Sequence, residues 1–187
     1  MIQSLNKHGV IEWWVDASFA VHDDMKSRTG LCMSLGKGSV YAASTKQKLN
    51  TNSSTESELV GVSDGMPKMI WTRYFMEAQG QNIEDVYVYQ DNQSAMLLEK
   101  NGMKSVGKNS RHIRIKYFFI TDRVKDNELK IIYCPTKEMV ADFFTKPLQG
   151  ILFINHRNTI LGITEENMPL YRKEYAVYKQ LNVINKS

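Results

Sequence analysis

Four segments of the 187-residue chain each offer a carboxylate that could take part in chemistry. The acids are Asp16, Asp91, Asp142 and either Glu56 or Glu58. Converging carboxylates with no rival cluster of cysteines and histidines suit hard cations such as Mg²⁺. Two such ions, held roughly 3.5–4 Å apart, form a clamp for phosphoryl chemistry. A fold that brings the four acids together would therefore supply the ligands for metal-assisted phosphoryl chemistry.

The segment before Asp91 predicts how this acid is positioned. Residues 86–89 are β-branched or aromatic, which is typical of a buried strand that ends close to the acid. Asn92 can cap the helix that is expected to begin at Ser94. In α/β sheets, the ends of strands border the crevice in which ligands bind. Taken alone, Asp91 could be only a helix cap, but acids in matching settings in three other segments favour a shared site.

The first part of the chain predicts three antiparallel strands. Apolar and polar residues alternate over 11–19, which indicates a strand with Asp16 in its second half. Two further strands are expected at 30–35 and 39–44, and a glycine-lysine-glycine sequence supplies the turn between them. Three successive strands of this kind form an antiparallel meander.

A helix is expected to follow a stretch that is dense in hydroxyls and acids. Ser53 with Glu56, and Thr55 with Glu58, each have the spacing of a capping box at a helix start. Pro67 lies inside the apolar pattern of this helix and is expected to kink or break it. The two glutamates would point about 200° apart, so only one of them can face the other acids. Periodicity does not choose between them.

The second half of the chain alternates helices and strands, and the whole order predicts a mixed α/β fold. We expect a five-stranded mixed sheet, an antiparallel meander followed by parallel strands, flanked by helices. The later elements are expected as helices at 94–100, 111–125 and 151–160, a strand at 128–134, and a short helix at 137–146 that bears Asp142.

Length and composition are those of one soluble globular domain with a real core. We expect a flexible lead-in at 1–10, one domain at 11–162 and a tail at 163–187. Cys32 and Cys134 show no CxxC spacing and are expected to be reduced core residues. No apolar run reaches membrane-spanning length and no signal-peptide pattern begins the chain, so no membrane partner is expected. The formal net charge of +4 fits a polyanionic partner but does not require one.

Several short motifs occur in an order that resembles the ribonuclease H domain of copia-type LTR retrotransposon Pol polyproteins. Each motif alone is moderately specific, whereas the ordered set is highly specific. The resemblance spans roughly residues 11 to 160. The motifs are VDAS at 15–18, STKQK at 44–48, SSTESEL at 53–59, YQDNQ at 89–93, SRHI at 110–113 and ADFFTKPL at 141–148.

The resemblance implies a ribonuclease H-like fold and a metal-dependent endoribonuclease, which hydrolyses the RNA strand of RNA–DNA hybrids during retrotransposon reverse transcription. It implies two Mg²⁺ ions, with Mn²⁺ as an alternative, held by Asp16, Glu58, Asp91 and Asp142. Glu58 is chosen over Glu56 because the helix acid of the family directly precedes a leucine or similar residue. The implied partners are the hybrid and the reverse transcriptase domain of the same polyprotein, and the implied location is the cytoplasm, in virus-like particles.

Basic and polar residues near these acids are candidates for nucleic-acid contacts, because phosphate contacts dominate nucleic-acid affinity. Two departures from the cellular enzymes stand out. Ser54 and Thr55 replace asparagines that contact the minor groove of the hybrid, whereas Gln93 matches a family residue near the RNA strand. The loop at 134–138 lacks the histidine of those enzymes, for which His112 is a candidate substitute. The full set of candidates is Ser18, Lys46, Lys48, Ser54, Thr55, Asn92, Gln93, Arg111, His112 and Arg114.

Two other functions stay open on the sequence. A catalytically weak domain could hold the hybrid or serve as a scaffold of the reverse transcriptase, although the intact acid set argues against loss of catalysis. An integrase-like DNA transferase on a similar fold would need three acids, the last a glutamate on a late helix, which the Asp142 segment fits less well. The sequence does not determine the oligomeric state.

Overall fold

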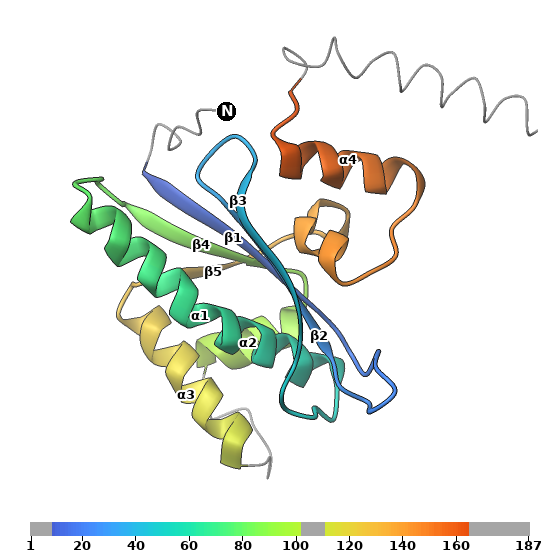
Figure 1. The fold of residues 1–187 in the computed structure, drawn as a ribbon. Helices are drawn as coiled ribbons and strands as arrows, with labels where there is room; N and C mark the ends of the chain where they lie inside the picture. The colour runs from blue at the N-terminus through green and yellow to red at the C-terminus, as the bar shows by residue number, and fades with distance from the viewer. Residues whose placement is uncertain (1–8, 102–110, 165–187) are drawn as a thin grey trace, which may run out of the picture.

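Strands, α-helices and two 3₁₀ turns build the described part of the chain (Figure 1). The computed structural model describes residues 9–101 and 111–164, although not the side chains of 100, 101, 111–114 and 117. Its elements are β1 (Val10–Ser18), β2 (Arg28–Ser34), β3 (Ser39–Lys46), α1 (Ser54–Ala78), β4 (Asp85–Gln90), α2 (Gln93–Asn101), α3 (Arg111–Lys125), β5 (Lys130–Tyr133), the 3₁₀ turns η2 (Thr136–Glu138) and η3 (Val140–Phe144), and α4 (Gly150–Leu161).

The first strand of the chain forms the centre of the sheet, whose order is β3-β2-β1-β4-β5. β1 pairs antiparallel with β2, with Trp13 opposite Met33, and parallel with β4, with Trp13 opposite Val88. β2 and β3 are antiparallel, and β4 and β5 are parallel. This arrangement confirms the predicted sheet, an antiparallel meander followed by parallel strands.

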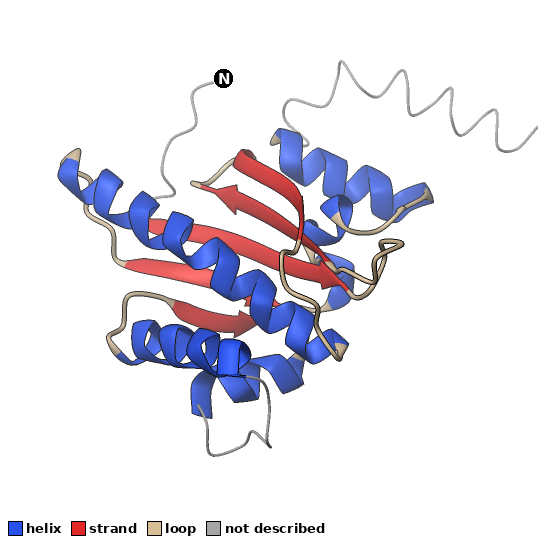
Figure 2. Ribbon diagram, turned by 60° about the horizontal axis from the view of Figure 1, so that its bottom comes forward, coloured by secondary structure: helices blue, strands red, loops and turns tan. Residues whose placement is uncertain are grey.

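Side chains of β1 alternate between the two faces of the sheet, because successive residues of a strand point to opposite sides. Ile11, Trp13 and Val15 are fully buried in the main core, which α1 and α3 cover. Trp14 and Asp16 point to the other face, toward the segment that contains η3. Figures 1 and 2 show α1 and α3 on one side of the sheet and α4 on the other.

A glycine of β2 lets the η3 segment approach the sheet closely. Gly30 is the register partner of Asp16. A Cβ atom on Gly30 would lie 2.7 Å from the carbonyl oxygen of Ala141 and 2.8 Å from a methyl group of Thr145. These distances are shorter than normal van der Waals contacts, so any larger residue would push the segment away. The glycine therefore places residues 141–145 beside Asp16.

The long helix α1 begins as predicted but is not broken by its proline. The Ser53 side chain accepts a hydrogen bond from the backbone N–H of Glu56, which is one half of the predicted capping box. The alternative start at Thr55 is wrong. Pro67 lies inside the continuous helix Ser54–Ala78, so the expectation of a break is also wrong. Pro67 is exposed to solvent, and the helix remains anchored by buried residues on both sides of it, among them Met66 and Met69.

The predicted short helix at 137–146 is two 3₁₀ turns instead, which corrects the sequence analysis. Met139 separates η2 from η3 and has an extended ψ of 89°. Its side chain is fully buried against Cys134 and Ala141. The ψ of Met139 lies outside the helical region and ends the helical run there, so Asp142 lies in η3 rather than on an α-helix. The helix expected at 151–160 is present as α4.

Further expectations concern the cysteines, membrane-spanning helices and the two ends of the chain. Cys32 and Cys134 are both free and buried, as predicted. No helix in the described ranges is long and apolar enough to cross a membrane. Residues 1–8 of the expected lead-in and 165–187 of the expected tail lie outside the described residues, so these two domain assignments stay predictions.

Candidate functional site

Three of the four predicted acids come together at one edge of the sheet. Asp16 lies near the end of β1, Asp91 follows β4, and Glu58 lies in the second turn of α1. Each offers a carboxylate oxygen, and these three oxygens lie within 4.8 Å of one another. β1 and β4 are parallel neighbours, so the residues at their carboxyl ends meet at the same edge. The start of α1 places Glu58 beside them.

The ionised form of Glu58 is disfavoured by its surroundings. It is 4% exposed, and its Oε2 atom has no hydrogen-bond partner. Burial, and then the charges of Asp16 and Asp91, raise the pKa of Glu58 well above its ordinary value. A hydrogen bond from the backbone of Ala17 opposes this shift only in part. The carboxylate therefore favours either a proton or a bound cation.

Asp142 is linked to Asp16 through Lys146 and is not one of the three closely spaced acids. The close group of three acids does not include Asp142. The ammonium group of Lys146 lies 2.7 Å from Oδ1 of Asp142 and 3.3 Å from Oδ1 of Asp16, so it bridges the two. Burial raises the pKa of Asp142 to about 6, although its hydrogen bond with Lys146 acts in the opposite direction. The site thus contains four acids and one resident cation.

Hydroxyl groups orient two of the clustered carboxylates. The Thr145 hydroxyl donates a hydrogen bond to Oδ2 of Asp16. The Ser18 hydroxyl donates to the backbone carbonyl of Thr145 at 2.8 Å, which ties the end of β1 to the segment after η3. The Thr136 hydroxyl of η2 donates to Oδ2 of Asp91 at 3.1 Å. The turns η2 and η3 therefore support the site that β1 and β4 begin.

Glu56 has a structural role outside the acid cluster. Its Oε2 atom accepts a hydrogen bond from the backbone N–H of Asn52 at 2.8 Å, directly before the helix cap. Glu56 is 8% exposed, so it caps the helix rather than turning toward solvent. The choice of Glu58 over Glu56 as a member of the cluster agrees with this geometry. A role for Glu58 in metal binding stays a prediction.

Apart from Ser18, whose hydroxyl donates to the carbonyl of Thr145, the predicted nucleic-acid contacts fall into three groups. Ser54, Thr55 and Gln93 are exposed or half-buried at the helix starts next to the acids, whereas Asn92 caps α2 by accepting from the N–H of Ala95. Lys46 and Lys48 are exposed. The third group, Arg111, His112 and Arg114, begins α3, and its side chains lie outside the described part of the structure.

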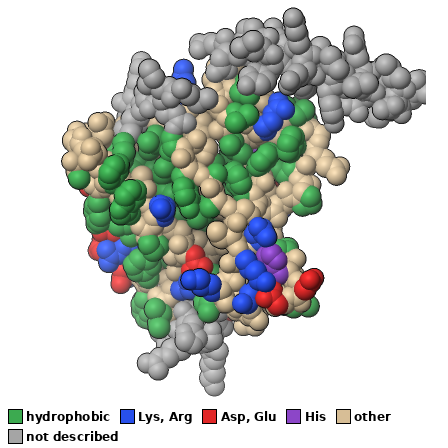
Figure 3. All heavy atoms as spheres, in the orientation of Figure 1, with side chains coloured by type: hydrophobic (Ala, Val, Ile, Leu, Met, Phe, Trp, Pro, Cys, Tyr) green, Lys and Arg blue, Asp and Glu red, His purple; other side chains and the backbone are tan. Residues whose placement is uncertain are grey.

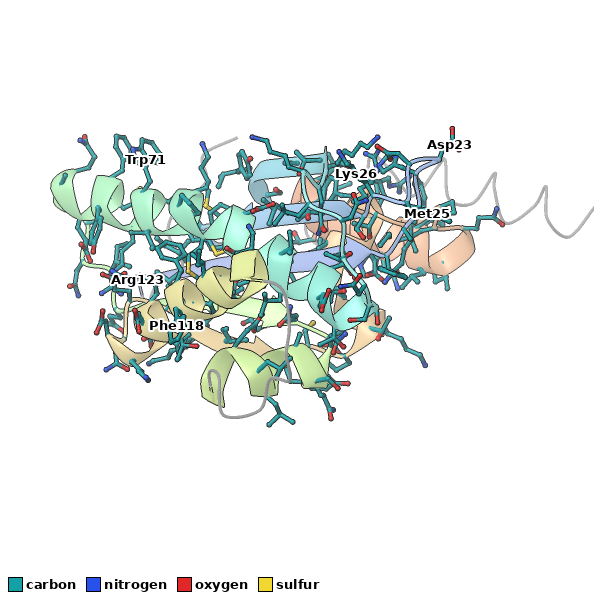
Figure 4. The ribbon with its side chains drawn as sticks, turned by 90° about the horizontal axis from the view of Figure 1, so that it is seen from below. Asp23, Met25, Lys26, Trp71, Phe118 and Arg123 are labelled. Atoms are coloured by element: carbon teal, nitrogen blue, oxygen red, sulfur yellow. The ribbon has the colours of Figure 1, made fainter. Side chains whose placement is uncertain are left out.

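Lys46 has an acidic neighbour that the sequence analysis missed. Asp24, in the loop between β1 and β2, forms an ion pair with Lys46 at 2.9 Å and lies 3.9 Å from Lys26. Figure 3 shows charged side chains of both signs over this end of the molecule. Figure 4 places Asp23, Met25 and Lys26 at the opposite end from Trp71 of α1. Part of the positive charge of this surface is therefore already neutralised.

Lys146, Thr145 and Thr136 are the functional candidates that sequence reasoning missed. The spacing of Asp142 and Lys146, four residues apart, was a usable signal for their contact. No pattern in the sequence indicated that the same lysine also reaches Asp16, because that contact depends on how the η3 segment packs on the sheet.

Relatives of the chain are polyproteins of transposons. The chain is 33% identical over 138 residues to the retrovirus-related Pol polyprotein from transposon TNT 1-94 of Nicotiana tabacum, a match that covers 73% of this chain and 10% of the relative. It is 30% identical over 162 residues to the Pol polyprotein from transposon RE1 of Arabidopsis thaliana, which covers 86% of this chain and 10% of the relative. The chain thus spans about a tenth of the length of these relatives. No protein-family model matches the chain.

Solved structures with a similar fold are ribonuclease H domains. LC11-RNase H1, isolated from compost, has a TM-score of 0.52 at 12% identity and covers 73% of this chain and 92% of its own. The N-terminal RNase H domain of a Mycobacterium tuberculosis protein has a TM-score of 0.51 at 8% identity and covers 73% and 90%. At these identities the likeness establishes the fold. The chain therefore has a ribonuclease H-like fold and belongs to the family of copia-type, retrovirus-related transposon Pol polyproteins.

Proposed function

We propose that the chain is a metal-dependent endoribonuclease that hydrolyses the RNA strand of RNA–DNA hybrids during retrotransposon reverse transcription. One observation carries this proposal: Asp16, Glu58 and Asp91 offer carboxylate oxygens that lie within 4.8 Å of one another. The ribonuclease H-like fold and the relationship to Pol polyproteins support the same function. Acids at this spacing repel one another, so a cation is expected between them.

The acid cluster fits a hard divalent cation. Glu58 leaves a buried oxygen without a partner, and carboxylate oxygens are the ligands that Mg²⁺ prefers. Asp16, Glu58 and Asp91 would hold one Mg²⁺ or Mn²⁺ ion, and we propose that Asp142 helps to hold a second. Ions bound there would lower the pKa of the attacking water and stabilise the leaving oxygen.

Lys146 partly neutralises the negative charge around Asp142. Its ammonium group contacts both Asp16 and Asp142 and compensates their mutual repulsion. The Lys146 side chain is 38% exposed, so it can move toward solvent and release both acids to a second ion. We propose that Lys146 holds the two carboxylates in position until metal and substrate bind.

The proposed hybrid contacts surround the clustered acids. Ser54 and Thr55 begin the helix that carries Glu58, and Gln93 follows Asp91 by two residues. Hydroxyl and amide groups can recognise the 2′-hydroxyls that distinguish the RNA strand from the DNA strand. The proposed contacts come from Ser18, Lys46, Lys48, Ser54, Thr55, Asn92, Gln93, Arg111, His112 and Arg114.

Lys46 and Lys48 test the basic part of this surface. Replacing both with glutamine should weaken hybrid binding and flatten its dependence on salt, because each phosphate contact releases counterions. Lys48 should contribute more than Lys46, which already pairs with Asp24. Binding measured at several salt concentrations checks this expectation, with Lys37→Gln in the exposed β2–β3 turn as the control. An unchanged salt slope in the double variant would remove this surface from the proposal.

We further propose that the domain acts beside the reverse transcriptase domain of the same polyprotein, in cytoplasmic virus-like particles. The support is the relationship to Pol polyproteins, of which the matched region is about a tenth. Co-purification of the chain with the adjoining polyprotein segment, expressed separately, tests this partnership. Failure of the two proteins to co-purify would contradict it.

A catalytically weak hybrid-binding domain is the second candidate function. Lys146 is the observation that favours it, because a resident cation between Asp16 and Asp142 can neutralise these acids without a second metal ion. This candidate predicts hybrid binding with little cleavage under all metal conditions.

Cleavage of a labelled RNA–DNA hybrid in Mg²⁺ or Mn²⁺ tests both candidates, with duplex DNA, duplex RNA and single-stranded RNA as control substrates. We expect products only from the RNA strand of the hybrid. Asp91→Asn is the matched control, because it keeps the size of the side chain and removes its charge. Cleavage that persists in EDTA would contradict metal dependence. Hybrid binding without cleavage by the wild-type chain would favour the weak hybrid-binding domain.

A further inference from the structure

A cavity of about 430 Å³ lies between α4 and the sheet. Its lining comes from β1, β4, α4 and the segment from Cys134 to Val140. The volume falls in the range of small-molecule sites, roughly 300–1,000 Å³. None of the proposed metal or nucleic-acid ligands lines it, so the cavity is separate from the acid site.

Two aromatic rings form one wall of the cavity. Trp14 of β1 and Tyr89 of β4 are register partners, and their rings stack with centroids 5.1 Å apart at 27°. The Tyr89 hydroxyl donates a hydrogen bond to Glu12 at 3.0 Å, which fixes its ring. A rigid aromatic wall of this kind suits contact with another flat ring.

His156 of α4 lines the same cavity, and its side chain contains an unsatisfied polar atom. It is 3% exposed, and its Nε2 atom has no hydrogen-bond partner. Burial lowers the pKa of His156, so the imidazole is neutral at pH 7 and offers one donor and one acceptor. Buried polar atoms in proteins are normally hydrogen-bonded. A polar atom of an occupant would supply the missing partner.

The rest of the lining narrows the kind of occupant. Lys137 and Glu138 are exposed at the rim and carry opposite charges, so the rim favours neither anions nor cations. Asn155 and Thr159 add an amide and a hydroxyl from α4. The acid cluster is the only group of three or more close-lying possible metal ligands among the described residues, and it lies outside this cavity.

We propose that this cavity binds a neutral planar heterocycle with hydrogen-bond donors and acceptors on its edge, which is the chemistry of a nucleobase. The ring packs against Trp14 and Tyr89, and its edge meets Nε2 of His156. The heterocycle can come from a free nucleoside or from an unpaired base of a single strand. This binding site goes beyond the proposed cleavage function and does not depend on it.

Calorimetric titration of the full chain with adenosine and uridine tests the site, in buffer without divalent cations so that no cleavage contributes. We expect saturable binding that His156→Leu weakens about tenfold, the effect of losing one buried hydrogen-bond partner. His22→Leu is the matched control, because His22 also has a buried Nε2 without a partner but does not line the cavity. It should bind like the wild type.

Further arms of the titration identify the source of the heterocycle. Nucleoside 5′-monophosphates should bind within about twofold of the nucleosides, because the rim carries one exposed charge of each sign. A single-stranded oligonucleotide that binds where nucleosides do not would assign the site to an unpaired base. Trp14→Leu and a melting curve for each variant guard against loss of folding. Absence of binding by nucleosides and oligonucleotide, or binding that both cavity variants leave unchanged, would overturn the proposal.

Discussion

The two halves of the acid site handle the same problem, repulsion between buried carboxylates, in different ways. Around Glu58 and Asp91, no lysine or arginine among the described residues forms an ion pair with either acid, and one oxygen of Glu58 has no hydrogen-bond partner. Around Asp142, the ammonium group of Lys146 lies 2.7 Å from the carboxylate and also reaches Asp16. Asp16 belongs to both halves.

On the proposed function, the half with Glu58 and Asp91 would depend on a cation from solution, whereas the half with Asp142 carries its own in Lys146. The half with Glu58 and Asp91 should gain most from added metal, because no ion pair among the described residues compensates its charge. The half with Asp142 should be stable without metal and should resist a second ion until Lys146 moves. Mutations in the two halves should therefore have separable effects on stability, metal binding and cleavage.

The largest effect is expected from Asp91→Asn, in the half without a resident cation. Cleavage of the RNA–DNA hybrid should fall by orders of magnitude, because the side chain keeps its size but loses the charge that would hold the proposed metal ion. The metal-free protein should be as stable as the wild type or more stable, because one charge has left a repulsive cluster. Cleavage assays and melting curves on the same preparation check both parts. Full activity, or a large loss of melting temperature, would contradict the expectation.

Glu58 in one half and Asp142 in the other should make the stability of the metal-free protein depend on pH. Burial and Asp16 raise the pKa of Glu58 well above its ordinary value, and burial raises the pKa of Asp142 to about 6. Between the ordinary and the raised pKa values, the folded state binds more protons than the unfolded state. The stability of the metal-free protein should therefore fall as the pH rises from about 4 to 6 and beyond.

Urea unfolding across this pH range, with and without Mg²⁺, measures the effect. Added Mg²⁺ should reduce or reverse the fall, because it stabilises the ionised acids. Glu58→Gln should weaken the pH dependence of the metal-free protein and lower cleavage by orders of magnitude. A stability that rises over the same range in the metal-free wild type would show that the acids are ionised without cost.

Lys146→Met tests the half that carries its own cation. The metal-free protein should lose about 1–2 kcal/mol of unfolding free energy, less than for a fully buried pair because the lysine side chain is 38% exposed. Metal affinity should rise, since an ion no longer competes with the ammonium group. Urea unfolding and calorimetric metal titration measure the two effects, with Lys37→Met as the control. Unchanged metal affinity would place Lys146 outside the metal site.

The smallest effect is expected from Glu56→Gln, two residues from Glu58 on the same helix. Glutamine can still accept the hydrogen bond from the N–H of Asn52, so the helix cap should lose well under about 1 kcal/mol. Cleavage should stay close to the wild-type rate, because Glu56 lies outside the acid cluster. A cleavage defect as large as that of Glu58→Gln would reverse the assignment of the two glutamates.

Much of the fold could be predicted because local patterns and long-range packing agree. Alternation in β1, the turn after β2 and the Ser53 cap each have strong local signals, and the structure contains all three. The choice of Glu58 rests on the resemblance to the family, in which the helix acid directly precedes a leucine or similar residue. Periodicity alone placed both glutamates equally well. The break expected at Pro67 is absent because the helix is held by tertiary packing, which local propensity does not contain.

The Asp142 segment could not be predicted in detail for a different reason. The non-helical backbone of the fully buried Met139 separates the expected helix into two turns, and only the packed structure reveals this burial. The contact of Lys146 with Asp16 joins residues 130 positions apart. The ion pair between Lys46 and Asp24 likewise depends on where a loop lies. Such contacts between distant segments leave no periodic signal in a single sequence.

The central position of β1 has a consequence for how the domain folds. β1 is the first strand in the chain, yet it pairs with β4, about 75 residues later, and Asp16 meets Thr145, 129 residues later. Contacts between such distant segments form slowly, because long loops must close before the contacts can stabilise them. The hairpin of β2 and β3 and the helix α1 are local and should form first. We therefore expect the acid site to be assembled in the last steps of folding, so that a partly folded chain carries its carboxylates apart.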